Sequence, residues 1–200
     1  MRAEYLPCTG GAAQEVVLLH GWGCNREVWR PLLRYLRPWA NVTLLDLPGC
    51  VPGAEPPAGD DPLAGLLAEV LESVPARAVY VGWSLGGQLA GSLAAQYPER
   101  VSALVTLCSS PRFLADADWP GMDPAEFEQF RAALATDAGG ALRRFHALQV
   151  RGAVDCRGLL RELLGLQRQA PGRELGCGLD WLAHLDLRAT LPGLEVPQLH

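Results

Sequence analysis

The feature that most constrains this fold is a G-x-S-x-G motif at residues 82–86. An apolar, β-branched stretch at residues 78–83 leads into it, and a helical pattern at residues 86–97 leaves it. A serine on such a tight strand-to-helix turn is forced into a strained backbone conformation that raises its hydroxyl above the sheet. The motif's glycines fit because side chains there would collide where strand and helix nearly touch. The alternative is a glycine-rich turn with a chance serine, but both flanks favour Ser84 as a nucleophile.

Apolar stretches alternate with helical patterns along the first 110 residues. Strands are predicted at residues 15–20, 42–46, 78–83 and 101–107, and helices at residues 26–36, 62–73 and 86–97. Strands separated by helices imply parallel strands joined by crossovers. The sequence therefore predicts an α/β fold with a mostly parallel sheet that helices cover on both faces.

The residue pattern of the sequence changes between residues 111 and 190, where no strand pattern is found. Ala, Leu, Arg and Gln recur there at helical spacing, and helices are predicted at residues 124–134, 140–149 and 157–169. A strand-like stretch at residues 195–200 follows. We therefore expect a core at residues 1–110, a helical cap inserted at residues 111–190, and a return to the core at residues 191–200.

Composition narrows the function classes. All 17 basic residues are arginines, which excludes Schiff-base chemistry on a lysine, and the net charge of −5 argues against a nucleic-acid-binding protein. No apolar run approaches the roughly 18–20 residues of a membrane span, and no secretory leader is evident, so we expect a cytoplasmic protein without a membrane partner. Six cysteines lack C-x-x-C or metal-ligand spacing, so we expect reduced thiols, no metal and no cofactor.

A second motif, H-G-W-G at residues 20–23, ends the strand predicted at residues 15–20. A glycine-rich turn there can aim a backbone N–H at the point that the N–H after the nucleophile also reaches. We therefore expect the N–H groups of Trp22 and Leu85 to form an oxyanion hole, where one lost donor costs about 3–4 kcal/mol of transition-state stabilisation. His20 is a candidate general base, but a histidine at a strand end before glycine is more typical of a structural hydrogen bond.

Together these motifs resemble the α/β-hydrolase family. D-L-P-G at residues 46–49 and Y-P-E-R-V at residues 97–101 fit loops of that family. Within it, the chain is similar over nearly all its length to the methyl ester esterases of biotin biosynthesis, which act on pimeloyl-acyl carrier protein. The segments that carry this likeness are L-H-G-W-G at residues 19–23, R-E-V-W at 26–29, V-G-W-S-L-G-G at 81–87, A-L-V-T at 103–106, S-S-P at 109–111, W-P-G at 119–121 and R-F-H-A-L-Q at 144–149.

The resemblance implies a serine carboxylesterase that cleaves the methyl ester of pimeloyl-acyl carrier protein and acts as a monomer. It places substrate binding on Trp22, Ser84, Leu85, Phe145, His146, Ala147, Leu148 and Gln149. Among the aromatic residues of these motifs, Trp83 and Phe145 fit an ordinary core equally well. The chain departs from the family pattern at Gly140, where a basic residue is expected, and after Gly49, where the loop reads C-V-P-G.

Residues 143–168 hold six arginines and only two acids. Arg157 and Arg161 are four residues apart, on one face of a predicted helix. Such a patch suits a phosphopantetheine phosphate or an acidic carrier protein, whereas the alternative is a solvated helix face whose charges pair locally. The resemblance implies carrier contacts at Arg144, Arg157 and Arg161.

An acyl-transfer serine also needs a histidine base and a carboxylate, which follow the serine in this fold's chain order. His146, His184 and Asp186 do not fit that order, and His200 lies where a strand residue belongs. We therefore expect an incomplete sequence that lacks the last strands and helices of the fold. Because the triad acid and histidine would be absent, we expect negligible turnover from these 200 residues.

Two other functions stay open on this sequence. One is a general short-chain carboxylesterase or lipase of the same fold, which would cleave free esters without a carrier. The other is a hydrolase-like binding module that kept the cap but lost catalysis.

Overall fold

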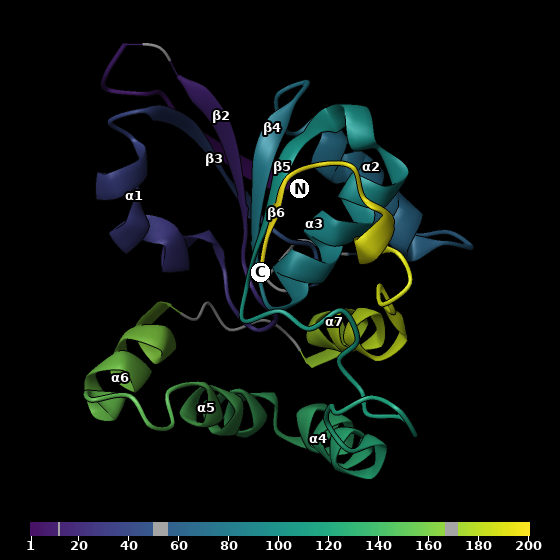
Figure 1. The fold of residues 1–200 in the computed structure, drawn as a ribbon. Coiled ribbons are helices and arrows are strands. Elements are labelled where there is room, and N and C mark those ends of the chain that lie inside the picture. The colour runs from purple at the N-terminus through teal and green to yellow at the C-terminus, as the bar shows by residue number, and fades with distance from the viewer. Residues whose placement is uncertain (12, 50–55, 167–171) are drawn as a thin grey trace.

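A computed structural model describes residues 1–11, 13–49, 56–166 and 172–200 (Figure 1). Its strands form one sheet in the order β1-β3-β2-β4-β5-β6. Their bounds are β1 (Arg2–Leu6), β2 (Gln14–Leu19), β3 (Ala40–Asp46), β4 (Ala78–Trp83), β5 (Val101–Leu107) and β6 (Gln198–Leu199). Strand β1 runs antiparallel to β3, and the other pairs are parallel. The predicted α/β class with a mostly parallel sheet is confirmed.

Helices cover both faces of the sheet, with α1 on one face and α2 and α3 on the other (Figure 1). Their bounds are α1 (Arg30–Leu36), α2 (Pro62–Glu72) and α3 (Leu85–Gln96), with single 3₁₀ turns η1 (Arg26–Trp29), η2 (Pro98–Arg100) and η3 (Leu191–Gly193). Strand β2 shows why two faces are covered. Val16 and Leu18 pack in the cluster on the α1 side, whereas Val17 and Leu19 pack on the side of α2 and α3. Burial on both faces explains the continuous apolar run in the sequence.

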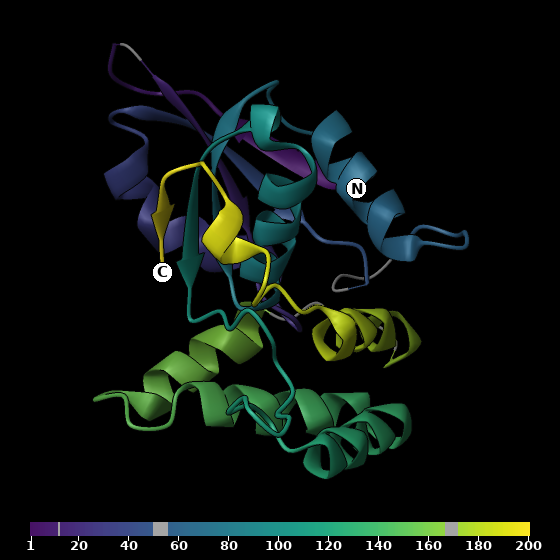
Figure 2. The same cartoon turned by 45° about the vertical axis from the view of Figure 1, so that its right-hand side comes forward.

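A layer of helices lies across the carboxyl ends of the parallel strands, as Figure 2 shows. It consists of α4 (Pro124–Thr136), α5 (Ala138–Gln149), α6 (Cys156–Leu166) and α7 (Gly172–His184), hereafter the helical layer. Aspartates fix where two of these helices begin. The Asp123 carboxylate accepts N–H bonds at the start of α4, and the Asp137 carboxylate accepts the Gly140 N–H at the start of α5.

Some elements differ from the sequence prediction. The single helix predicted at residues 26–36 is divided into η1 and α1, because Asn25 caps η1 and a proline lies in the first turn of α1. Strand β1 and helix α7 were not predicted as separate elements. The helix predicted at residues 157–169 ends at Leu166, and the rest of that prediction lies outside the described residues.

None of the helices formed by the described residues has the length and apolar content to cross a bilayer. The described cysteines are Cys8, Cys24, Cys108, Cys156 and Cys177, and of these Cys8, Cys108, Cys156 and Cys177 are free thiols. The sixth, Cys50, lies outside the described residues.

Candidate active site

Ser84 is the single residue that connects the last residue of β4 to the first residue of α3. Its backbone angles are φ +53° and ψ −119°, an arrangement that non-glycine residues rarely adopt and that costs about 1–3 kcal/mol. Hydrogen bonds hold the residue on both sides. Its N–H donates to the Leu107 carbonyl at 3.0 Å, and its carbonyl accepts from the Gly87 N–H at 2.9 Å and the Ser109 hydroxyl at 2.8 Å. The turn thus has the strain that the motif predicts.

The two glycines of the motif fill places where no side chain fits. A β carbon at Gly82 would overlap the backbone of Gly86, and one at Gly86 would overlap the carbonyl oxygen of Leu19. Both obstacles are backbone atoms, which cannot swing aside. Strand β4, helix α3 and strand β2 therefore approach one another only because both positions are glycine.

The loop at residues 20–23 lies directly beside Ser84. A β carbon at Gly21 would come within 3.2 Å of the Ser84 β carbon. Neither the Trp22 nor the Leu85 backbone N–H donates to any acceptor among the described residues. Leu85 also begins α3, whose N-terminus favours negative charge. Two free donors next to a serine can hold an oxygen that becomes negative.

His20 is fully buried at the base of this loop. Its Nδ1 bonds the Gly21 carbonyl at 2.9 Å, and its Nε2 accepts the Leu47 N–H at 3.0 Å, so the ring is the neutral tautomer with the proton on Nδ1. Burial lowers the pKa of His20 to about 4. The structural hydrogen-bonding role that the sequence favours is confirmed, since both ring nitrogens serve the backbone.

The side chains of the other three histidines also form hydrogen bonds with groups other than Ser84. Their partners are the Gln149 side chain for His146, the Asp180 carbonyl for His184 and the Thr106 hydroxyl for His200. Asp186 pairs with Arg188 and Arg112, and the hydrogen bond from Arg188 is the main cause that holds the pKa of its carboxyl well below the ordinary value. Among the described residues, the hydrogen bonds of Ser84 involve only its backbone. No imidazole of these 200 residues is therefore placed to take the serine proton.

The Trp22 side chain points away from solvent into the helical layer. It is fully buried, and its indole N–H donates to the Leu175 carbonyl on α7 at 2.8 Å. Phe145 on α5 and Phe130 on α4 meet its ring edge to face, with centroids 5.0 and 5.4 Å away. Trp83 packs instead on the α1 side of the sheet, as the core alternative predicts.

The predicted substrate segment at residues 145–149 is divided between two faces of α5. Phe145 and His146 face the interior, whereas Ala147 and Leu148 are exposed, Leu148 by 56%. Burial lowers the pKa of His146, while hydrogen bonds with the Gln149 side chain and the Gly23 backbone act in the opposite direction. The buried His146 ring therefore faces the loop that carries Gly23.

The predicted carrier contacts Arg144, Arg157 and Arg161 are exposed. None of them forms an ion pair within 4 Å with an acid among the described residues. Asp155 bonds the Gly158 N–H and so caps α6 rather than pairing with an arginine. Gly140, where the family pattern has a basic residue, donates its N–H to the Asp137 carboxylate that caps α5. The C-V-P-G loop after Gly49 lies outside the described residues.

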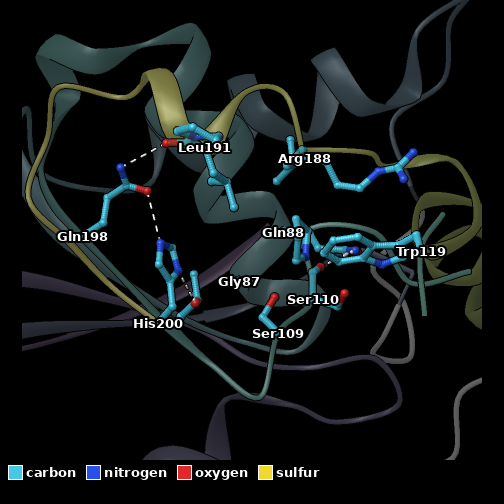
Figure 3. A pocket seen from close by; sticks show the side chains of 13 residues that line it. Gly87, Gln88, Ser109, Ser110, Trp119, Arg188, Leu191, Gln198 and His200 are labelled. Carbon is cyan, nitrogen blue, oxygen red and sulfur yellow. Dashed lines mark hydrogen bonds between the residues drawn. The ribbon is translucent and has the colours of Figure 1, made fainter. Parts of the chain in front are cut away.

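A pocket of about 490 Å³ opens beside the elbow (Figure 3). It is lined by Gly87, Gln88, Thr106, Ser109, Ser110, Pro111, Trp119, Leu187, Arg188, Leu191, Pro192, Gln198 and His200. Gln88 donates from Nε2 to the Ser110 carbonyl, while its Oε1 has no partner among the described residues. Sequence reasoning missed Ser109, which joins this pocket to the Ser84 carbonyl. The S-S-P motif at residues 109–111 was the available signal.

Known proteins resemble the chain in sequence over most of its length. The family described as "alpha/beta hydrolase fold" matches residues 15–187. A Vibrio campbellii protein named "Pimeloyl-[acyl-carrier protein] methyl ester esterase" is 40% identical over 192 residues, which cover 94% of this chain and 75% of the relative. A Klebsiella pneumoniae protein of the same name is 41% identical and covers 92% of this chain and 72% of its own length.

Solved structures share the fold at lower identity. The enol-lactonase from Burkholderia xenovorans has a TM-score of 0.81 and 21% identity, and the match covers 98% of this chain and 75% of that one. An esterase from Exiguobacterium antarcticum also has a TM-score of 0.81, with 22% identity over 98% of this chain and 74% of its own. The α/β-hydrolase resemblance is therefore confirmed at the level of fold.

The buried His20 predicts how stability depends on pH. The pKa of His20 is lowered to about 4 from 6.5, so the unfolded chain binds its proton first as the pH falls. Stability is therefore lost below about pH 6.5, by up to about 3 kcal/mol from this group at pH 4. Urea unfolding between pH 4 and 8 measures this slope, which His20→Gln should flatten. His184→Gln, at an exposed position, should leave the slope as it is; equal slopes in all three proteins would contradict the assignment.

Because the four histidines form hydrogen bonds away from Ser84, we expect these 200 residues to hydrolyse esters slowly. A positioned general base contributes about 10²–10⁴-fold. We therefore expect hydrolysis of a p-nitrophenyl ester at least about 100-fold slower than by the Vibrio campbellii relative in the same assay. A comparable rate would mean that one of the four histidines leaves its present partner and reaches Ser84.

Proposed function

This chain belongs to the alpha/beta hydrolase fold family, and on that premise we propose that it is a serine carboxylesterase that hydrolyses the methyl ester of pimeloyl-acyl carrier protein in biotin biosynthesis. The observation that carries the proposal is the strained Ser84 turn beside the Trp22 and Leu85 N–H groups, which donate to no acceptor among the described residues. The identity of the substrate is inferred from the relatives of 40% and 41% identity, which bear that enzyme's name.

The proposed reaction is acyl transfer through a covalent intermediate. The Ser84 hydroxyl attacks the ester carbonyl, and the Trp22 and Leu85 N–H groups hold the oxygen that becomes negative. Collapse of the tetrahedral species expels methanol and leaves the acyl group on Ser84. Water then repeats the attack and releases the free carboxylic acid. We further propose that the base and its carboxylate partner are not among these 200 residues, because the four histidines are bound elsewhere.

The proposed acyl site lies on the inner side of α5. Trp22 and Phe145 offer an apolar wall, and His146 stays neutral because burial lowers its pKa. Ala147 and Leu148 can contact the substrate only where it runs over the outer surface of α5, since both are exposed.

The proposed carrier site lies on the outer surface of α5 and α6. Arg144, Arg157 and Arg161 are exposed and are paired with no acid among the described residues, so their charges are available to a partner. An acidic carrier with a phosphate-bearing arm complements such a patch. This favours the carrier-dependent esterase over a general short-chain esterase, whose substrates offer no such charges.

Replacement of the nucleophile tests the reaction. In the full-length native protein, which on this proposal supplies the base and its carboxylate partner from outside these 200 residues, Ser84→Ala should lower kcat/KM for an ester by about 10³-fold or more, because the attacking oxygen is lost. The free energy of unfolding should stay within about 0.5 kcal/mol, since the Ser84 side chain makes no hydrogen bond with the described residues. Unchanged turnover in the folded variant would refute the assignment and favour a binding module.

Charge reversal tests carrier recognition. The double variant Arg157→Glu/Arg161→Glu should lower kcat/KM about three- to tenfold on a carrier-bound methyl ester, through slower encounter, and the loss should shrink as salt rises. A small free ester should be affected far less. Arg34→Glu/Arg77→Glu makes the same charge change at exposed positions outside the helical layer and serves as the control. Equal, salt-independent losses on both substrates would show that these arginines support the fold and bind no carrier.

A further inference from the structure

Helix α7 rests directly on the two residues that we propose as oxyanion donors. At Gly178 there is no room for a side chain, because a β carbon there would lie 2.6 Å from Trp22 Cδ1 and 3.1 Å from Trp22 Nε1. The same β carbon would lie 3.6 Å from Leu85 Cδ2. A distance below 3 Å requires something to move. The absence of a side chain at position 178 thus sets how near the helical layer sits to the site.

The Trp22 ring has little freedom to move away. Its N–H is bonded to the Leu175 carbonyl, one turn before Gly178 on the same helix. Phe130 and Phe145 meet the ring edge to face, and the side chain is fully buried. A rigid indole held by one hydrogen bond and two aromatic rings cannot fold aside as a long flexible chain would. A methyl group at position 178 must therefore displace the whole residue or the helix.

A displacement of the Trp22 side chain would also move its backbone N–H, which is one of the two proposed oxyanion donors. The Trp22 N–H belongs to the same short loop as Gly21, where an added β carbon would lie 3.2 Å from the Ser84 β carbon. A donor must lie about 2.7–3.1 Å from the developing oxyanion, and a misplacement of about 1 Å can cost roughly 100-fold in rate. A shift of the Trp22 N–H by a few tenths of an ångström is thus as large as the whole range of donor distances that stabilises the oxyanion.

We propose that Gly178 is a positioning residue: by admitting the Trp22 indole against α7, it lets the helical layer hold the oxyanion hole in its active geometry. This inference rests on the proposed function, because it takes the Trp22 and Leu85 N–H groups as the donors. It adds that the helical layer contributes to the rate of bond cleavage and not only to the binding of substrate.

Gly176 provides a matched control on the same helix. A β carbon at Gly176 would have nothing within 4 Å, so alanine is free to enter there. Gly176→Ala and Gly178→Ala both replace a glycine inside α7 and therefore gain the same intrinsic helix preference. Only the second one meets Trp22. Any difference between the two variants reports the contact and not the helix.

The test compares the native protein, Gly178→Ala and Gly176→Ala on a small free ester. We expect Gly178→Ala to lower kcat by about 10- to 100-fold while KM changes less than about threefold, since the lost interaction is made only in the transition state. Gly176→Ala should match the native protein. In ¹⁵N NMR, Gly178→Ala should shift the Trp22 indole N–H and the Trp22 and Leu85 amides, and Gly176→Ala should leave them in place. Native kcat together with unshifted signals in Gly178→Ala would overturn the proposal.

Two further measurements keep the outcomes separate. If the native protein shows no ester hydrolysis that depends on Ser84, the proposed function fails, and the NMR comparison alone decides whether Gly178 positions Trp22. If Gly178→Ala does not fold, Trp22→Phe removes the bond to the Leu175 carbonyl and keeps an aromatic ring in the same place. It should lower kcat several-fold with little change in KM and shift the Leu85 amide; native kcat with an unshifted Leu85 amide would overturn the proposal.

Discussion

The contact between helix α3 and strands β2 and β4 is the constraint on which the rest of the site depends. Backbone atoms occupy the space beside Gly82 and Gly86, so the chain must turn from strand to helix within one residue. That residue, Ser84, takes a strained backbone, and bonds to Leu107 and Ser109 offset the strain. Packing alone therefore places the hydroxyl at the carboxyl edge of the sheet, where the loop after β2 meets it.

The loop after β2 depends in turn on a buried neutral ring. His20 uses one nitrogen for the Gly21 carbonyl and the other for the Leu47 N–H, which ties the ends of β2 and β3 together. Because burial lowers the pKa of His20 to about 4, the ring carries no charge at neutral pH. In the proposed oxyanion hole, fixed peptide dipoles would then face the developing negative charge, namely those of the Trp22 and Leu85 N–H groups and of the α3 N-terminus. Such dipoles need no reorganisation when negative charge develops.

The sequence predicts the parts of this site that depend on neighbours in the chain. The elbow at Ser84 follows from two glycines and their flanks, because the collision that Gly82 avoids is with the backbone of Gly86, four residues further on. Ser109 and Gly178 could not be found this way, since their roles arise from contacts with Ser84 and Trp22, 25 and 156 residues away along the chain. Strand β1 escaped notice for a related reason. It is a half-exposed edge strand, so its residues lack the continuous apolar run that marks β2 and β3.

In the proposed function, helix α5 joins carrier recognition to acyl binding by carrying each on a different face. Arg144 lies exposed on its outer side, while the next two residues, Phe145 and His146, face Trp22 and the loop of Gly23. A helix turns by about 100° per residue, so adjacent positions serve opposite surroundings without any irregularity. Trp22 completes the link, because its backbone belongs to the proposed oxyanion loop and its side chain to the helical layer. Binding energy from a carrier on the outer face can thus act on the helices that fix Trp22, a route from remote contacts to transition-state stabilisation that leaves the elbow itself unchanged.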